Sequence, residues 1–261
     1  MPQARSAASI TYDEAHHNVV LFGGLAGQTV LGDTWTWTST GWSSHQGLSV
    51  SPSPRQGAAM GYDEASQQVI LFGGASGSGS LNDTWAWDGA AWQELRPDHS
   101  PPSREGAAIA YDPRWTSLIV FGGVDDATGS NLMDTWSWNG RDWLTSVAPF
   151  PGQSVRPRMG FLPAANLAEL YGDCGPSHDA TVYAFDGGWG GRGTSGDLPP
   201  ALCLPGLASN TDRRLIVLFG GKPTAGGTPS TSTWNYDGNI WARLSRSAGA
   251  TSATTPSTRT S

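Results

Sequence analysis

NVVLFGG at residues 18–24 returns as QVILFGG at 68–74, as SLIVFGG at 117–123 and as LIVLFGG at 215–221. A degraded fifth copy, LAELYGD at 167–173, stands between the last two. The aromatic residues of the five copies lie at positions 22, 72, 121, 171 and 219, so the copies follow one another at intervals of 48 to 50 residues. A fixed period of this length is the signature of a repeat architecture, and the chain therefore contains five repeats.

Other residue types recur in register with this pattern in the first three copies. An Arg and a Tyr precede the apolar run, and an Asp and three Trp follow it. These residues are Arg5, Arg55 and Arg104; Tyr12, Tyr62 and Tyr111; Asp33, Asp83 and Asp134; Trp35, Trp85 and Trp136; Trp37, Trp87 and Trp138; and Trp42, Trp92 and Trp143. Chance does not place so many residue types in register three times, so each copy is one structural unit.

The repeat divides into four short strands, which in the first copy span 7–12, 19–22, 34–37 and a stretch from 42 onward. The second strand has no polar alternation, which is typical of a strand covered on both faces. In the third strand the two Trp are two residues apart and so point to one face. Four strands per repeat, each sheet packed between its neighbours, predict the blades of a β-propeller. We expect the indoles of Trp35, Trp85 and Trp136 to be largely buried between blades.

A diglycine after an apolar run, then an aromatic pair and a later Trp, resembles the Kelch repeat in its bacterial form. The last copy even has Tyr236 where the other copies have Trp, as Kelch repeats usually do. The resemblance covers residues 5–245 and implies an all-β fold, a propeller of five four-stranded blades with the first strand innermost. The blades are expected at about 5–48, 49–97, 98–147, 148–196 and 197–245, before a disordered Ser/Thr/Ala-rich tail at 246–261. The residues expected to serve the repeat itself are Gly23, Gly24, Gly73, Gly74, Gly122, Gly123, Gly220, Gly221, Trp35, Trp85, Trp136 and Trp234.

The first and last copies start and end at the same phase of the repeat, so no blade can be completed by strands from both termini. Closure between the first and fifth blades must then rest on side-chain packing. We expect a closed five-bladed ring, which would be a monomer. The alternative is an open arc, or a fragment of a larger six- or seven-bladed propeller, with sticky apolar faces at its ends.

The fourth and fifth copies depart from the pattern. In copy four only 13 residues separate Arg158 from Tyr171, which predicts a turn between the first two strands that is shorter by about four residues. Asp179 is the expected partner of Arg158. In copy five, Leu202 and Ser209 replace the Arg and the Tyr, and Ser232 replaces the Asp.

Composition excludes several functional classes. The net charge is −7 and only one Lys is present, so the basic face that nucleic acid requires is missing. No apolar run approaches the length of a transmembrane helix, and Met1–Ile10 lacks the pattern of a signal peptide. The localisation stays open between the cytoplasm and, if a signal was removed, the cell exterior. Two cysteines do not make a disulfide framework, and we expect Cys174 and Cys203 not to be bonded to each other.

The candidate binding residues are Arg5, Arg55, Arg104 and Arg158. Strand order places the segments before the first and third strands at one end of the ring, here called face one. The four arginines would therefore surround the mouth of the central channel, where guanidinium groups could bind a carboxylate or phosphate. The alternative is that each Arg pairs with the Asp of its own repeat and holds the loops in place, and this alternative is favoured. The loops between the second and third strands also lie on face one, and they vary most among copies.

An enzyme is the weaker hypothesis. Copper oxidases with Kelch blades, of the galactose oxidase type, use Tyr and His ligands and a Tyr–Cys crosslink, but all six Tyr here fill repeat positions. No Ser/His/Asp or paired-carboxylate arrangement stands out. We expect no cofactor and no metal: Asp125-Asp126 lacks the spacing of a calcium loop, and His16-His17 is an adjacent pair. The sequence thus favours a non-catalytic module that binds a protein or other ligand through face one. The alternative is a carbohydrate-binding or sugar-modifying propeller, galactose-oxidase-like or epimerase-like.

Overall fold

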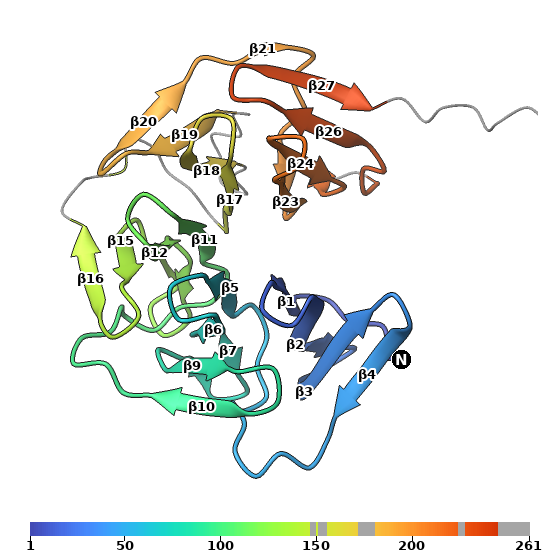
Figure 1. The fold of residues 1–261 in the computed structure, drawn as a ribbon, viewed down its shortest axis with the longest axis vertical. Coiled ribbons are helices and arrows are strands. Elements are labelled where there is room, and N and C mark those ends of the chain that lie inside the picture. The colour runs from blue at the N-terminus through green and yellow to red at the C-terminus, as the bar shows by residue number, and fades with distance from the viewer. Residues whose placement is uncertain (147–149, 151–155, 172–180, 224–227, 245–261) are drawn as a thin grey trace, which may run out of the picture.

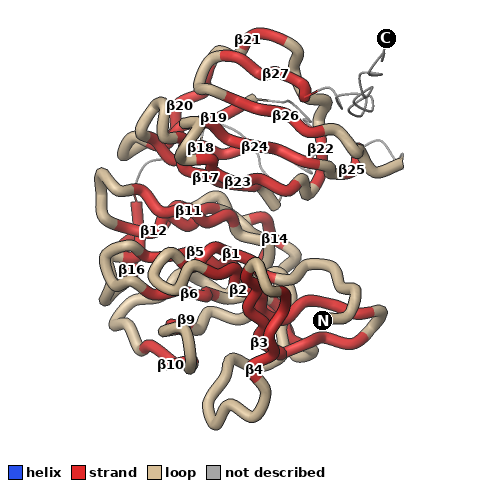
Figure 2. Tube along the Cα trace, turned by 45° about the vertical axis from the view of Figure 1, so that its right-hand side comes forward, coloured by secondary structure: helices blue, strands red, loops and turns tan. Residues whose placement is uncertain are grey.

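The computed structural model describes residues 1–146, 150, 156–171, 181–223 and 228–244. Every regular element in these ranges is a β-strand (Figures 1 and 2). Five antiparallel sheets are arranged in a ring like a five-bladed β-propeller, as the sequence predicts. No described segment forms a helix that could cross a membrane.

Each blade is a sheet in which strands that follow one another along the chain lie side by side. Blade one contains β1 (Ser9–Asp13), β2 (Asn18–Ala26), β3 (Thr29–Thr38) and β4 (Gly41–His45); blade two contains β5 (Ala59–Asp63), β6 (Gln68–Phe72), β9 (Thr84–Trp87) and β10 (Trp92–Leu95); blade three contains β11 (Ala108–Asp112), β12 (Ser117–Phe121), β15 (Thr135–Trp138) and β16 (Trp143–Ser146); blade four contains β17 (Arg158–Leu162), β18 (Leu167–Tyr171), β19 (Val182–Phe185) and β20 (Trp189–Arg192); blade five contains β23 (Gly206–Asn210), β24 (Leu215–Phe219), β26 (Thr233–Tyr236) and β27 (Ile240–Leu244).

The first strand of each blade lies nearest the centre of the ring and the last strand lies at its rim (Figure 1). β5 packs against β1 and β11, and β17 packs against β11 and β23. No packing of this extent joins β23 to β1 among the described strands, and blades one and five flank the remaining gap (Figure 1).

The core lies between the blades, and the apolar second strand supplies both sides of it. Val69 and Leu71 pack against blade one, whereas Ile70 and Phe72 pack against blade three. None of these four side chains is more than 1% exposed. The prediction of a strand covered on both faces is confirmed, because residue alternation sends successive side chains into different inter-blade cores.

The diglycine after this strand is required by a close backbone approach. Gly23 and Gly24 have φ values of 63° and 102°, in the left-handed region that favours glycine. A Cβ on Gly23 would lie 2.4 Å from the carbonyl oxygen of Arg55 in the next blade. Gly24 donates its backbone N–H to that same carbonyl at 2.8 Å. The diglycine thus turns the chain and links neighbouring blades.

Trp35, Trp85 and Trp136 are predicted to be largely buried, and the prediction is fully confirmed for one of them. Trp85 is 8% exposed, whereas Trp35 and Trp136 are half-buried. All three indole N–H groups bond to the Asp of their own repeat, so this bond does not account for the difference in burial.

Blade four has a turn of ordinary length, so the predicted shortening is wrong. Arg158 is the first residue of β17 and pairs in register with Tyr171, as Ala108 pairs with Phe121 in blade three. The repeat Arg stands four residues before that position, at Arg104 in blade three. Its counterpart in blade four falls in 151–155, outside the described residues, as does Asp179.

Blade five has two features that the repeat did not predict. β21 (Ser195–Gly196) runs parallel to β27 and adds a fifth strand to this sheet. Cys203, in the two-residue strand β22 (Leu202–Cys203), is disulfide-bonded, and no described cysteine is free. The expectation that Cys203 is not bonded to Cys174 is therefore wrong, because Cys203 is in a disulfide and the sequence has only one other cysteine. The sequence's other cysteine, Cys174, and the predicted tail at 246–261 lie outside the described residues.

Candidate functional site

The repeat arginines form a compact polar lock within each of the first three blades. In blade three, both terminal nitrogens of Arg104 bond to the carboxylate of Asp134, at 2.7 and 2.8 Å. One of them also donates to the carbonyl oxygen of Gly122 at 2.9 Å. Trp136 donates its indole N–H to the same carboxylate at 2.6 Å. Arg5–Asp33–Trp35 and Arg55–Asp83–Trp85 repeat this arrangement.

Electrostatics keep the carboxylates of these locks ionised. Bonds from Arg5 hold the pKa of Asp33 below its usual range. Burial by itself would raise the pKa of Asp134, but the bonds and charge of Arg104 outweigh it and the net pKa is lowered. The same balance lowers the pKa of Asp83 beside Arg55. Each lock is therefore a charged pair whose Arg is buried.

These contacts bear on the hypothesis of an anion-binding ring. Arg55 and Arg104 are each 1% exposed, and their guanidinium groups face inward onto their own Asp. Arg158 instead donates to the carbonyl oxygens of Pro205 and Pro157 at 3.2 Å. Burial and the charge of Arg156 lower the pKa of Arg158. The four arginines thus do not share one environment, and three of them are used by the repeat.

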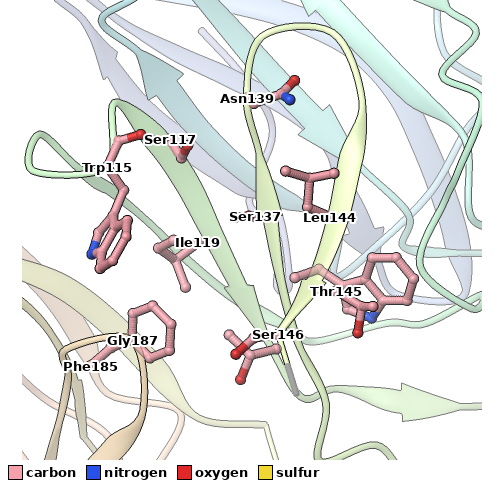
Figure 3. A pocket seen from close by; sticks show the side chains of 12 residues that line it. Trp115, Ser117, Ile119, Ser137, Asn139, Leu144, Thr145, Ser146, Phe185 and Gly187 are labelled. Atoms are coloured by element: carbon pink, nitrogen blue, oxygen red, sulfur yellow. Dashed lines mark hydrogen bonds between the residues drawn. The ribbon is translucent and has the colours of Figure 1, made fainter. Parts of the chain in front are cut away.

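A groove of about 410 Å³ opens between blades three and four. Figure 3 shows Trp115 and Phe185 on one side of it, Leu144 on the other and Ile119 between them. Trp115 is 52% exposed and Leu144 is 50% exposed, so the groove presents apolar surface to solvent. The other lining residues carry hydroxyl, amide or aromatic groups or are glycine: Ser117, Thr135, Trp136, Ser137, Asn139, Thr145, Ser146 and Gly187.

The groove arises where blade four departs from the repeat. Phe185 takes the place of Trp138 and its counterparts, since Ala168 pairs with Phe185 as Leu118 pairs with Trp138. Between blades two and three, the ring of Trp138 is buried in one cluster with Ile70 and Ala86. Between blades three and four, the equivalent Ile119 and Ser137 line the groove. The smaller Phe ring therefore leaves space that the Trp fills elsewhere.

A separate clamp fixes the mouth of the groove. Arg114, on the turn between β11 and β12, donates to Asp112 at 2.6 Å in its own blade. Across the blade boundary it donates to the carboxylate of Asp186 at 2.7 Å and to the carbonyl oxygen of Phe185 at 2.8 Å. The next residue, Trp115, lies against Gly187, where a Cβ would come within 3.7 Å of its ring. Arg114 thus holds the two turns that carry the aromatic walls, so the groove is preformed.

Sequence reasoning missed this groove, although a signal was present. Trp115 is the one Trp of the sequence's 13 that stands outside a repeat position. A large aromatic on a turn has no role in the repeat, and this makes Trp115 a candidate for a role outside it.

A buried carboxylate in blade four was also missed. Glu169 is 1% exposed and occupies the position that holds Ile70 and Ile119 in blades two and three. Its Oε1 lies 3.4 Å from the Nε of Arg192, but neither carboxylate oxygen has a hydrogen-bond partner among the described residues. Burial raises the pKa of Glu169 to about 7, and the charge of Arg192 opposes this rise only in part. An acid inside the apolar run LAELY was the sequence signal.

Glu169 predicts that stability falls with rising pH. Between about pH 4.5 and 7 the folded chain holds a proton on Glu169 that the unfolded chain has lost, so the free energy of unfolding decreases across this window. The expected decrease is about 3 kcal/mol and levels off above pH 7. Urea unfolding at a series of pH values measures it. Glu169→Gln should remove this slope and be more stable than the wild type at pH 8, whereas Glu94→Gln at an exposed site should keep it. A variant Glu169→Gln with the wild-type slope would show that Glu169 is not the group responsible.

Within the described ranges, no three His, Cys, Asp or Glu side chains gather as metal ligands would. No protein-family model and no curated protein matches this sequence. The assignment to a repeat family therefore rests on the sequence pattern alone.

Proposed function

We propose that this chain is a Kelch-type, non-catalytic binding module whose ligand occupies the groove between blades three and four. The supporting observation is the lining: an exposed Trp and a Phe face hydroxyl and amide side chains, and none of the described lining residues has a carboxylate, imidazole or thiol. Ligand sites are commonly apolar clefts with a few well-placed polar groups. Without a general acid or base, the groove is suited to binding rather than to bond cleavage.

The favoured ligand class is a neutral carbohydrate. The flat ring of Trp115 can pack on the C–H face of a sugar, and Asn139, Ser137 and Thr145 offer donors and acceptors to its hydroxyl groups. No described lining residue is charged, and the nearby Arg114 and Asp186 are paired with each other at the mouth of the groove.

Trp115→Ala is expected to abolish most of this binding while leaving the fold intact. Loss of the aromatic wall should weaken affinity by about tenfold or more. A glycan array identifies the sugar, and isothermal titration calorimetry of wild type and variant measures the loss. Leu198→Ala removes a comparably exposed apolar side chain, 48% exposed, from outside the groove and should bind like the wild type. Equal affinity of Trp115→Ala and wild type for every sugar retained on the array would refute the groove as the site.

A protein partner on face one is the second candidate, because two loops there are structured. β7 (Ala75–Ser76) pairs with β8 (Gly79–Ser80), and β13 (Val124–Asp125) pairs with β14 (Ser130–Asn131). The backbone N–H of Asp126 donates to the Ser80 hydroxyl at 2.8 Å and ties the two ribbons together. An affinity pull-down that survives Trp115→Ala but is lost on exchanging these ribbons for short Gly-Ser turns would favour this candidate.

A further inference from the structure

The inter-blade contacts share one set of side chains. The Trp at or next to the start of the last strand of a blade packs on the aromatic residue that closes the apolar run in the second strand of the preceding blade. The ring centroids are 5.4 Å apart for Trp92 on Phe22, 5.0 Å for Trp143 on Phe72, 5.1 Å for Trp189 on Phe121 and 5.3 Å for Trp241 on Tyr171. This contact is thus present at all four packed interfaces.

A hydrogen bond completes the contact at three of these interfaces. The indole N–H donates to the hydroxyl of the Thr that pairs with this aromatic residue on the third strand of the preceding blade: Trp92 to Thr34 and Trp143 to Thr84 at 2.9 Å, and Trp189 to Thr135 at 2.8 Å. At the fourth interface Val182 stands in the Thr position. The indole N–H of Trp241 has no partner among the described residues there. The Thr is therefore what satisfies the buried indole.

Blades one and five, at the two ends of the ring, each carry part of this set of contact residues without the residues that pair with them at the other interfaces. Blade five ends its second strand with Phe219 and starts its third strand with Thr233. In blade one, Trp42 is the second residue of the last strand, β4. Phe219 is 55% exposed, whereas its counterpart Phe72 is 1% exposed beneath Trp143. Neither the indole of Trp42 nor the hydroxyl of Thr233 has a hydrogen-bond partner within the described ranges.

The rest of the outer face of blade one is also uncovered. Ile10 is 58% exposed and Trp37 is 43% exposed, although their counterparts Met60 and Trp87 in blade two are buried. These side chains lie on the blade that borders the gap in Figure 1. This face of blade one therefore has the side chains of an inter-blade contact, but no neighbouring blade packs on it.

We propose that blade five of the same chain covers this face, with Trp42 packed on Phe219 and its indole N–H donated to the hydroxyl of Thr233. This fifth contact continues the interface found at the other blade boundaries and closes the ring. Blade five is preferred over a second copy because both halves belong to one chain, which gives them a high effective concentration. Closure removes apolar surface that would otherwise promote association.

A double-mutant cycle tests the contact. Trp42→Phe keeps a ring but removes the N–H donor, and Thr233→Val removes the acceptor at constant shape. Each single variant is expected to raise the unfolding equilibrium constant by about fivefold or more, the usual worth of one hydrogen bond. The double variant should be about fivefold less destabilised than the product of the singles, because one bond is counted twice. The same cycle with Trp143→Phe and Thr84→Val, at an interface already formed, gives the reference coupling.

The cycle is measured by urea unfolding at two protein concentrations, alongside light scattering on size-exclusion chromatography. Coupling that is independent of concentration in a monomer supports closure within the chain. Additive effects at both concentrations would overturn the proposal. So would coupling that disappears on dilution together with a dimer peak, since the partner would then be a second copy.

Discussion

Replacing Arg104 with Met is expected to lower the free energy of unfolding by about 3–5 kcal/mol, the usual cost of removing one partner from a buried ion pair. The Arg104 side chain is fully buried, and its loss leaves the carbonyl oxygen of Gly122 without its side-chain donor and the charge of Asp134 uncompensated, with only the indole N–H of Trp136 still bonded to that carboxylate. The backbone of Arg104 also binds blade two, through Gly74 and Leu81, so a disturbance here spreads across the blade boundary. Chemical denaturation followed by Trp fluorescence measures the change.

Arg96→Met is the matched control for this prediction. Arg96 is 87% exposed and pairs with Glu94 at 3.6 Å, so its loss should cost no more than about 1 kcal/mol. Arg104→Met combined with Asp134→Leu should recover part of the loss, because the uncompensated charge is then gone as well. Similar unfolding midpoints for Arg104→Met and Arg96→Met would show that the lock does not stabilise the fold.

The lock also predicts that the free energy of unfolding falls at acid pH, and this part of the pH profile is here called the acid limb. The pKa of Asp134 is lowered in the folded state, so the stabilisation is present above the ordinary pKa of an Asp and is lost as the pH falls through the folded value. In Arg104→Met this limb should flatten, because the unfolded and folded pKa values of Asp134 then approach each other. The acid limb and the rise of stability from pH 7 toward 4.5 caused by Glu169 occupy different windows, so one titration separates them.

The repeat made the fold predictable. The spacing of the diglycines sets the number of blades, and the unbroken apolar run identifies a strand buried on both faces, as Ile70 and Leu71 show. The pairing of Arg5, Arg55 and Arg104 with their own Asp could also be anticipated, because a residue that recurs with the repeat usually serves it. The register of blade four could not be counted from Arg158, because this Arg lies four residues after the position of the repeat Arg and is not its equivalent.

The groove depends on how blades three and four pack against each other, which the spacing of residues in the sequence does not reveal. Trp115 and Phe185 are 70 residues apart in the sequence. They line one groove because Arg114 holds the turns of blades three and four together. The exchange of Trp for Phe185 is visible in the alignment of repeats, but whether it leaves a cavity or a collapsed interface is decided by packing. The open boundary between blades one and five is equally a matter of packing, because all five copies contain the same strands.

Trp143→Ala is expected to lower the free energy of unfolding by about 3–5 kcal/mol, the typical cost of truncating a buried Trp. The ring is 1% exposed, lies 5.0 Å from the ring of Phe72 and 5.3 Å from that of Trp138, and donates to Thr84 at 2.9 Å. Truncation therefore leaves a cavity between blades two and three and an unsatisfied hydroxyl beside it.

Two further variants divide this loss into its parts. Thr84→Val removes only the acceptor and should cost about 1–2 kcal/mol, because the buried indole N–H is left without a partner. Trp115→Ala removes an indole that is 52% exposed and should change stability by less than about 1 kcal/mol. If Trp143→Ala proved as stable as Trp115→Ala, the indole would not be the element that joins neighbouring blades. The same reasoning would then fail for Trp92 and Trp189, whose contacts have the same geometry.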